Sequence, residues 1–167
     1  MKKYFNKIVM LLVVTTLATS CFNDFPVDDR GLLITTKNEC YISNFSLYDS
    51  SQSEILVGSA YIDTTAQVVV GYIRHGQQID HVWPRVSLCT DAILTPKITT
   101  WTDFTGSKMD VAFVNGDFAS GVPQTQLGER VVANGNFPST ALKYSVVSGN
   151  RKTTKEYTFV IVERPLQ

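Results

Sequence analysis

Beyond residue 40 the chain is patterned like a series of short strands. Residues 41–48 (YISNFSLY) alternate between polar and apolar positions, and residues 67–73 (QVVVGYI) are mostly β-branched or aromatic. Such runs, separated by turn residues, are typical of strands. The expected strands are residues 41–48, 55–63, 67–73, 80–88, 111–114, 131–133, 142–147 and 157–162. Since no convincing run of apolar positions at helical spacing follows Cys21, the pattern predicts an all-β sandwich or barrel.

Two of these strands can be placed more closely. Pro84 restricts residues 80–88 to a sheet edge or a break, because proline has no N–H to donate to a neighbouring strand. In residues 157–162 both alternating faces are fairly apolar. We therefore expect residues 143–162 to form a hairpin whose second strand is central or covered on both sides.

The first 21 residues have a different pattern. Three lysines precede a continuous apolar run at residues 8–14, which is too short to cross a bilayer and is typical of a secretory signal peptide. The segment LATSC, ending at Cys21, resembles the lipobox of bacterial lipoproteins. The resemblance implies that residues 1–20 are cleaved and that Cys21 is lipidated. The alternatives are an ordinary signal peptide with an unmodified Cys21, or a buried amphipathic helix.

Cleavage changes the charge of the chain. The full sequence has 15 basic and 15 acidic residues, and residues 1–20 contain three lysines and no acidic residue. The mature chain therefore has 12 basic and 15 acidic residues, a formal charge of −3. Such a balance gives no electrostatic reason to bind nucleic acid, so no nucleic-acid partner is expected. The expected partner of the anchor is the membrane.

Residues 21–36 are expected to be the lipidated cysteine and a solvated tether, with Pro26 and three aspartates. The acidic stretch resembles the surface-export signals of Bacteroides-type lipoproteins. It favours a lipid-anchored protein of the outer membrane, on the cell surface rather than the periplasmic face. Residues 37–167 have a suitable length for a single domain.

Several short motifs of this domain occur in a familiar order. They are ILTP at residues 93–96, Asp103-Phe104, and YSVVSGNRKTTKEYT at residues 144–158. This order resembles immunoglobulin-like domains of unknown function in Bacteroides-type outer-membrane lipoproteins, often encoded near SusC/SusD-type glycan uptake systems. The resemblance implies an immunoglobulin-like β-sandwich. This sequence departs from the family pattern at residues 105–141, which form an insertion. The insertion is expected to hold a hairpin or a long loop, and it is either decorative or a binding feature.

No catalytic motif is recognisable, so the chain is expected to be a non-enzyme without metal or cofactor. His75 and His81 lack a metal-ligand spacing and are expected to be surface turn residues. Asp103 and Asp110 form an imaginable glycosidase pair, but Asp103 is better explained as a turn acceptor beside Phe104.

Cys40 and Cys89 remain after lipidation of Cys21. An export compartment permits a disulfide between them, yet their spacing does not match the antibody pattern. We favour free, buried thiols.

The candidate ligand-binding residues are Trp101, Trp83 and Phe118. An exposed aromatic ring stacks well on a sugar ring, although core packing is the usual role of such residues. Trp101 lies in a polar, turn-rich segment and is expected to be partly exposed, with capping of the core as the alternative. The hypothesis is an accessory or binding module for surface glycans. The alternative is a structural or protein-interaction component of an envelope complex.

Overall fold

The computed structural model describes residues 25–109 and 124–163. Cys21, Asp110, Phe118 and the expected strand 111–114 lie outside the described residues. The chain divides into two units, Met1–Ile34 and Thr35–Gln167, which are described separately. Among the described residues, no helix has both the length and the apolar character needed to cross a membrane.

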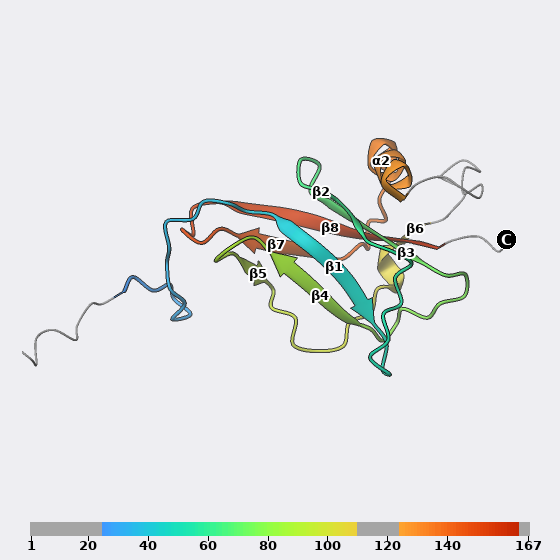
Figure 1. Ribbon diagram of the computed structural model, residues 1–167, viewed down its shortest axis with the longest axis horizontal. Helices are drawn as coiled ribbons and strands as arrows, with labels where there is room; N and C mark the ends of the chain where they lie inside the picture. The colour runs from blue at the N-terminus through green and yellow to red at the C-terminus, as the bar shows by residue number, and fades with distance from the viewer. Residues whose placement is uncertain (1–24, 110–123, 164–167) are drawn as a thin grey trace, which may run out of the picture. The chain divides into compact units, whose positions relative to one another are not determined.

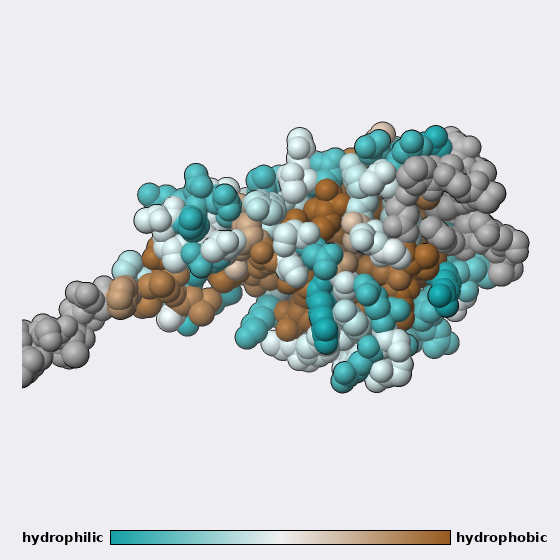
Figure 2. Space-filling view, in the orientation of Figure 1, coloured by the Kyte–Doolittle hydropathy of each residue, from teal (hydrophilic) through white to brown (hydrophobic). Residues whose placement is uncertain are grey.

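In the first unit, residues 25–34 form a closed turn within the expected tether. Val27 pairs with Leu33 in an antiparallel bridge, and the Asp28 side chain accepts hydrogen bonds from the N–H groups of Arg30 and Leu32. Four large apolar side chains of this turn are exposed: Phe25, Val27, Leu32 and Leu33. Figure 2 shows hydrophobic surface gathered over this segment.

The second unit is mostly β, as the alternating pattern predicts (Figure 1). Its strands are β1 (Ile42–Tyr48), β2 (Tyr61–Asp63), β3 (Val68–Ile73), β4 (Trp83–Leu88), β5 (Ile93–Thr95), β6 (Lys108–Met109), β7 (Lys143–Val147) and β8 (Thr154–Glu163). A 3-10 turn, η1 (Thr105–Ser107), and one helix, α2 (Gln124–Asn134), complete the described elements.

The strands form two sheets. β1 and β4 make an antiparallel pair, while the larger sheet has the order β2-β3-β8-β7-β5, with β6 also paired to β8. β8 pairs in parallel with β3 and β6 and antiparallel with β7. The last six residues of β8 are buried, except for Thr158, which is half-buried. This confirms the expected central strand of a C-terminal hairpin.

The main core lies between the two sheets. Phe45 of β1, Phe159 of β8 and Phe104 before η1 meet there as tilted or edge-on ring pairs, with centroid distances from 5.0 to 6.5 Å. Val69 and Ile73 of β3 belong to the same cluster. From Asn44 on, where the register of β1 is regular, Phe45 and Leu47 point into this core. Asn44, Ser46 and Tyr48 are therefore left on the outer face of the β1–β4 sheet.

The helix α2 corrects the prediction that the chain has no helix and that residues 131–133 form a strand. Leu127 and Val131, four positions apart, are both buried. They pack on the face of the larger sheet that points away from β1 and β4, together with Val70 and Val160. A pair at this spacing is a helical signal, which the β-branched content of the short segment RVVA concealed. The described residues of the insertion thus contain η1, β6 paired to β8, and the packed helix α2, and no hairpin is found among them.

The helix lies very close to β2. A Cβ atom at Gly128 would come within 2.1 Å of the Tyr61 ring, so only glycine permits this approach. Figure 1 shows α2 over β2 and β3. This face of the larger sheet is thus covered, whereas Asn44, Arg85 and Ser87 on the outer face of the β1–β4 sheet are exposed.

Candidate functional site

A short antiparallel pairing brings together two segments that are distant in the sequence. Val82 and Thr102 exchange two backbone hydrogen bonds, with N–O distances of 3.1 and 2.8 Å. The Val82 side chain is buried. Because side chains alternate along an extended chain, the neighbours Trp83 and Trp101 lie on the opposite, outer face.

The two tryptophans are in direct contact. Their ring centroids are 5.7 Å apart, with an angle of 76° between the planes, and His81 stacks on Trp101 at 4.8 Å and 18°. Trp101 is 38 % exposed and Trp83 is half-buried. The expected partial exposure of Trp101 is confirmed. His81 is exposed, as expected, but it also belongs to an aromatic cluster that the sequence does not reveal.

The cluster continues across the sheet into β1. Trp83 is directly opposite Tyr48 in the β1–β4 register, and Tyr48 is half-buried on the outer face. The Arg85 guanidinium carbon lies 4.2 Å from the centroid of the Tyr48 ring. Directly opposite residues of antiparallel strands share one face of a sheet. Trp101, Trp83 and Tyr48 therefore form a line across the strands, which we call the aromatic row.

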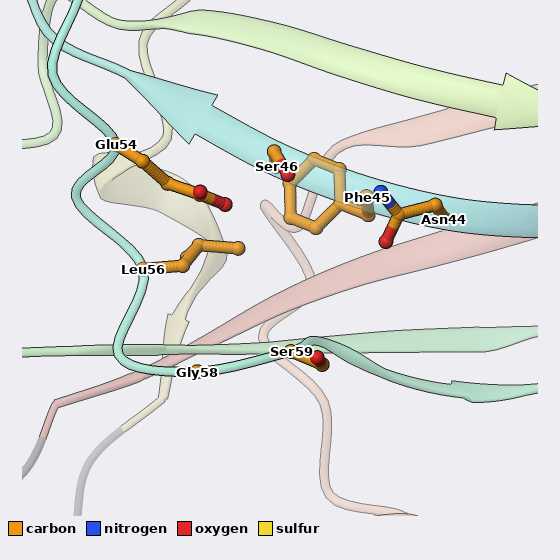
Figure 3. Close-up of a pocket in the computed structure, with 7 residues that line it drawn as sticks. All are labelled: Asn44, Phe45, Ser46, Glu54, Leu56, Gly58 and Ser59. Carbon is orange, nitrogen blue, oxygen red and sulfur yellow. The ribbon is translucent and has the colours of Figure 1, made fainter.

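Beyond the aromatic row lies a cleft of about 280 Å³. Tyr48 pairs with Glu54 in an antiparallel bridge, and Glu54 lines this cleft together with Asn44, Phe45, Ser46, Leu56, Gly58 and Ser59. Figure 3 shows Glu54 and Leu56 extending from the segment after β1 toward the β1 side of the cleft. The aromatic row thus ends at the cleft.

Asp103 has the role that the sequence predicts. Its carboxylate accepts hydrogen bonds from the Thr105 hydroxyl (2.6 Å) and the Thr105 N–H (2.8 Å), which close the turn before η1. These bonds lower the pKa of Asp103. No group of three metal-ligating side chains is found in the part of the chain that the structure describes.

Cys40 and Cys89 are both buried and free, as expected. The Cys40 thiol donates to the carbonyl of Val146 at 2.9 Å, and burial raises the pKa of this thiol. A buried thiol with a raised pKa is a poor nucleophile, because the thiolate is the reactive form. Its role is packing.

The other histidine, His75, belongs to a polar cluster at the end of β8. The carboxylate of Glu163, which is only 7 % exposed, accepts a hydrogen bond from the Gly76 N–H at 2.6 Å and pairs with Lys108. His75 Nδ1 lies 2.9 Å from the same carboxylate. The hydrogen bond from Lys108 is the main cause that lowers the pKa of Glu163, followed by that from Gly76. We call these four residues the Glu163 cluster.

No family model matches the chain, and no curated protein matches it. Its structure resembles in part a putative glycoside hydrolase from Bacteroides thetaiotaomicron VPI-5482, with 16% identity and a TM-score of 0.49 over 77% of this chain and 26% of that one. A putative secreted protein from Bacteroides fragilis NCTC 9343 is 14% identical, with a TM-score of 0.44 over 76% of this chain and 97% of that protein.

A third similar structure is a DUF4623 family protein from Bacteroides eggerthii DSM 20697. It is 9% identical, with a TM-score of 0.43 over 77% of this chain and 22% of that protein. The chain thus spans about a quarter of the length of the first of these proteins and nearly all of the second. At such low identities and TM-scores, these similarities assign no activity to this chain.

Proposed function

We propose that this chain is a non-enzymatic lipoprotein of the bacterial outer membrane, anchored through Cys21, whose β-rich domain binds surface glycans. The observation that carries the proposal is the aromatic row on the uncovered face of the β1–β4 sheet. Aromatic side chains offer flat apolar surface at a low cost in conformational entropy. Sugar rings present apolar C–H faces that fit such a surface.

We also propose that the domain is an immunoglobulin-like sandwich. The two sheets around a common core support this assignment. The parallel pairing of β3 with β8 and the helix on the outer side of the larger sheet are features that the motif resemblance does not account for.

The test of glycan binding compares three proteins on an array of soluble polysaccharides and by isothermal titration. Trp101→Ala removes the most exposed ring of the aromatic row. Tyr41→Ala is the matched control, since Tyr41 is also 38 % exposed but lies outside the row. We expect Trp101→Ala to lower affinity at least tenfold and Tyr41→Ala to bind like the wild type. Equal loss in both variants, or no binding by the wild type, would refute the proposal.

The location has its own test. The native protein from the membrane fraction is expected to begin at an acylated Cys21, as measured by intact mass, and to be removed from whole cells by protease. An acylated chain that resists the protease would place the protein on the periplasmic face. An unacylated chain would show that Cys21 is not a lipid anchor.

A second candidate function is a protein-interaction role in an envelope complex. The four exposed apolar side chains of the turn at residues 25–34 favour it, because apolar groups gathered on a surface often mark a contact site. We expect a partner to co-purify from cross-linked membranes. A Leu32→Ser, Leu33→Ser double variant is expected to lose that partner while keeping glycan binding.

A further inference from the structure

The cleft at the end of the aromatic row is rich in unused hydrogen-bonding groups. Asn44, Ser46, Glu54 and Ser59 line it, and the side chains of these four form no hydrogen bonds with the described residues. They supply hydroxyl, amide and carboxylate groups, which together both donate and accept. Asn44, Glu54 and Ser59 are exposed, so these groups are available to a ligand.

The backbone of β1 adds to this lining. The carbonyl of Leu47 accepts a hydrogen bond from Ile55, so the backbone groups of Leu47 point away from β4. The β1–β4 register is regular from Asn44 to Tyr48, and backbone groups two positions apart point to the same edge. The N–H and C=O of Phe45 therefore face the cleft, where no described strand pairs with them.

The position of Glu54 connects the cleft to the aromatic row. Trp101, Trp83, Tyr48 and Glu54 occupy four neighbouring positions across the strands. Adjacent strands are about 4.8 Å apart, so the line spans about 14 Å. This length suits an extended chain of several sugar residues, with rings stacked on the row and one residue in the cleft.

We infer that the cleft is a second sugar-binding subsite, which takes one residue of a neutral glycan chain whose neighbouring residues lie along the aromatic row. This inference rests on the proposed function. The volume of about 280 Å³ is close to the lower end of ligand pockets, about 300 Å³, and suits one small polar unit. The Glu54 carboxylate accepts hydrogen bonds from sugar hydroxyls and repels anionic glycans.

An extended peptide fits the cleft less well. A peptide strand added to a sheet edge gains its affinity from a series of main-chain hydrogen bonds. Here the edge of β1 is already closed at Leu47 and Tyr48 by the segment that contains Glu54 and Ile55. The free edge around Phe45 is therefore too short for such a series.

The experiment measures affinity against chain length. Cello-, xylo-, manno- and malto-oligosaccharides of two to six residues are titrated into the wild type, Glu54→Ala, Trp101→Ala and the control Glu39→Gln. Glu39 is an exposed carboxylate outside the cleft. Because the Glu54 side chain is exposed and forms no hydrogen bond to the described residues, its removal leaves the fold intact.

We expect the wild-type affinity to rise with chain length and then level off. Glu54→Ala is expected to lose about tenfold in affinity for the longest chains, and to bind the shortest chains like the wild type and Glu39→Gln. Amide signals of Phe45 and Gly58 should shift only with the longer chains.

Three results would overturn the inference. They also distinguish the failure of the cleft as a subsite from the failure of the proposed glycan binding. If Trp101→Ala loses binding and Glu54→Ala matches the wild type at every length, the cleft is not a subsite but the proposed function stands. If no oligosaccharide binds, or Trp101→Ala binds normally, the proposed function fails as well. If a displayed-peptide library yields a peptide that shifts Phe45 and Gly58 while oligosaccharides do not, the cleft belongs to a protein partner.

Discussion

The two histidines, six positions apart, lie in neighbourhoods of opposite character. His81 stacks on the exposed Trp101 ring, beside the aromatic row. His75 instead contacts the buried carboxylate of Glu163, which also binds Lys108 and Gly76. Both histidines are exposed, so their own burial does not distinguish them. The difference lies in their partners, an open aromatic surface in one case and a buried charge in the other.

This contrast separates binding from stability. The Glu163 cluster joins the end of β8 to the turn after β3 and to β6, three segments that are far apart in the sequence. The aromatic row, in contrast, leaves polar and aromatic groups facing solvent. We therefore expect substitutions in the cluster to change the free energy of unfolding, and substitutions near the row to change ligand affinity.

The largest effect is expected from Glu163→Gln. The substitution keeps the shape of the side chain but removes the charge that pairs with Lys108. Hydrogen bonds to charged groups contribute more than neutral ones, so we expect the free energy of unfolding to fall by about 1–2 kcal/mol in urea titrations. The control is Glu156→Gln, in a pair with Lys143 that is more than half exposed, where the change should stay within about 0.5 kcal/mol. Equal changes in both variants would show that the buried pair has no special role.

The same carboxylate predicts how stability depends on pH. The pKa of Glu163 is lowered in the folded state from its ordinary value of 4.5. Its contribution is therefore fully present above about pH 4.5 and is lost as the pH falls through the lowered, folded-state pKa. In urea titrations from pH 7 to pH 3, the wild type should lose more stability than Glu163→Gln. Asp49 and Asp103, whose pKa values are also lowered by hydrogen bonds, remain in both proteins and cancel in the comparison. Parallel pH profiles would contradict this assignment.

A smaller effect is expected at Gly76, whose N–H donates to Glu163. Its φ of +73° lies in the left-handed region, although a Cβ atom would meet nothing within 4 Å. Gly76→Ala is therefore expected to cost about 1 kcal/mol through backbone conformation alone. Gly76→Asn should cost less, because asparagine tolerates this region better. The measurement is thermal unfolding of both variants, and a larger loss in Gly76→Asn would contradict the explanation.

Much of the fold follows from local pattern. The alternation in residues 41–48 and the apolar content of residues 157–162 place β1 and the buried β8, since each residue's face is set by strand geometry. The sequence pattern does not reveal helix α2, because its apolar face has only a few residues, among which Leu127 and Val131 are buried. A short β-branched segment such as RVVA fits both the helical repeat of 3.6 residues and the strand repeat of two residues.

The candidate site was predictable only in part. The exposure of Trp101 follows from its polar, turn-rich surroundings. Its contact with Trp83 depends on the pairing of Val82 with Thr102, twenty positions away, and no local signal encodes that pairing. The addition of Tyr48 and Glu54 depends on sheet register, which is a tertiary property. The same limit explains why the sequence predicts a surface turn position for both His75 and His81 and does not distinguish their partners.

The smallest effects are expected from replacing each histidine by alanine, which tests the contrast most directly. His81→Ala removes the ring that stacks on Trp101 and fixes its orientation. We expect glycan affinity to fall about threefold, because ordering a free side chain on binding costs about 0.5–1.5 kcal/mol. Its thermal stability should match the wild type. His75→Ala is expected to do the reverse, with unchanged affinity and a small decrease in melting temperature, because Glu163 keeps its bonds from Lys108 and Gly76. Titration and melting of both variants check this, and an equal loss of affinity in the two would mean that the neighbourhoods do not differ in function.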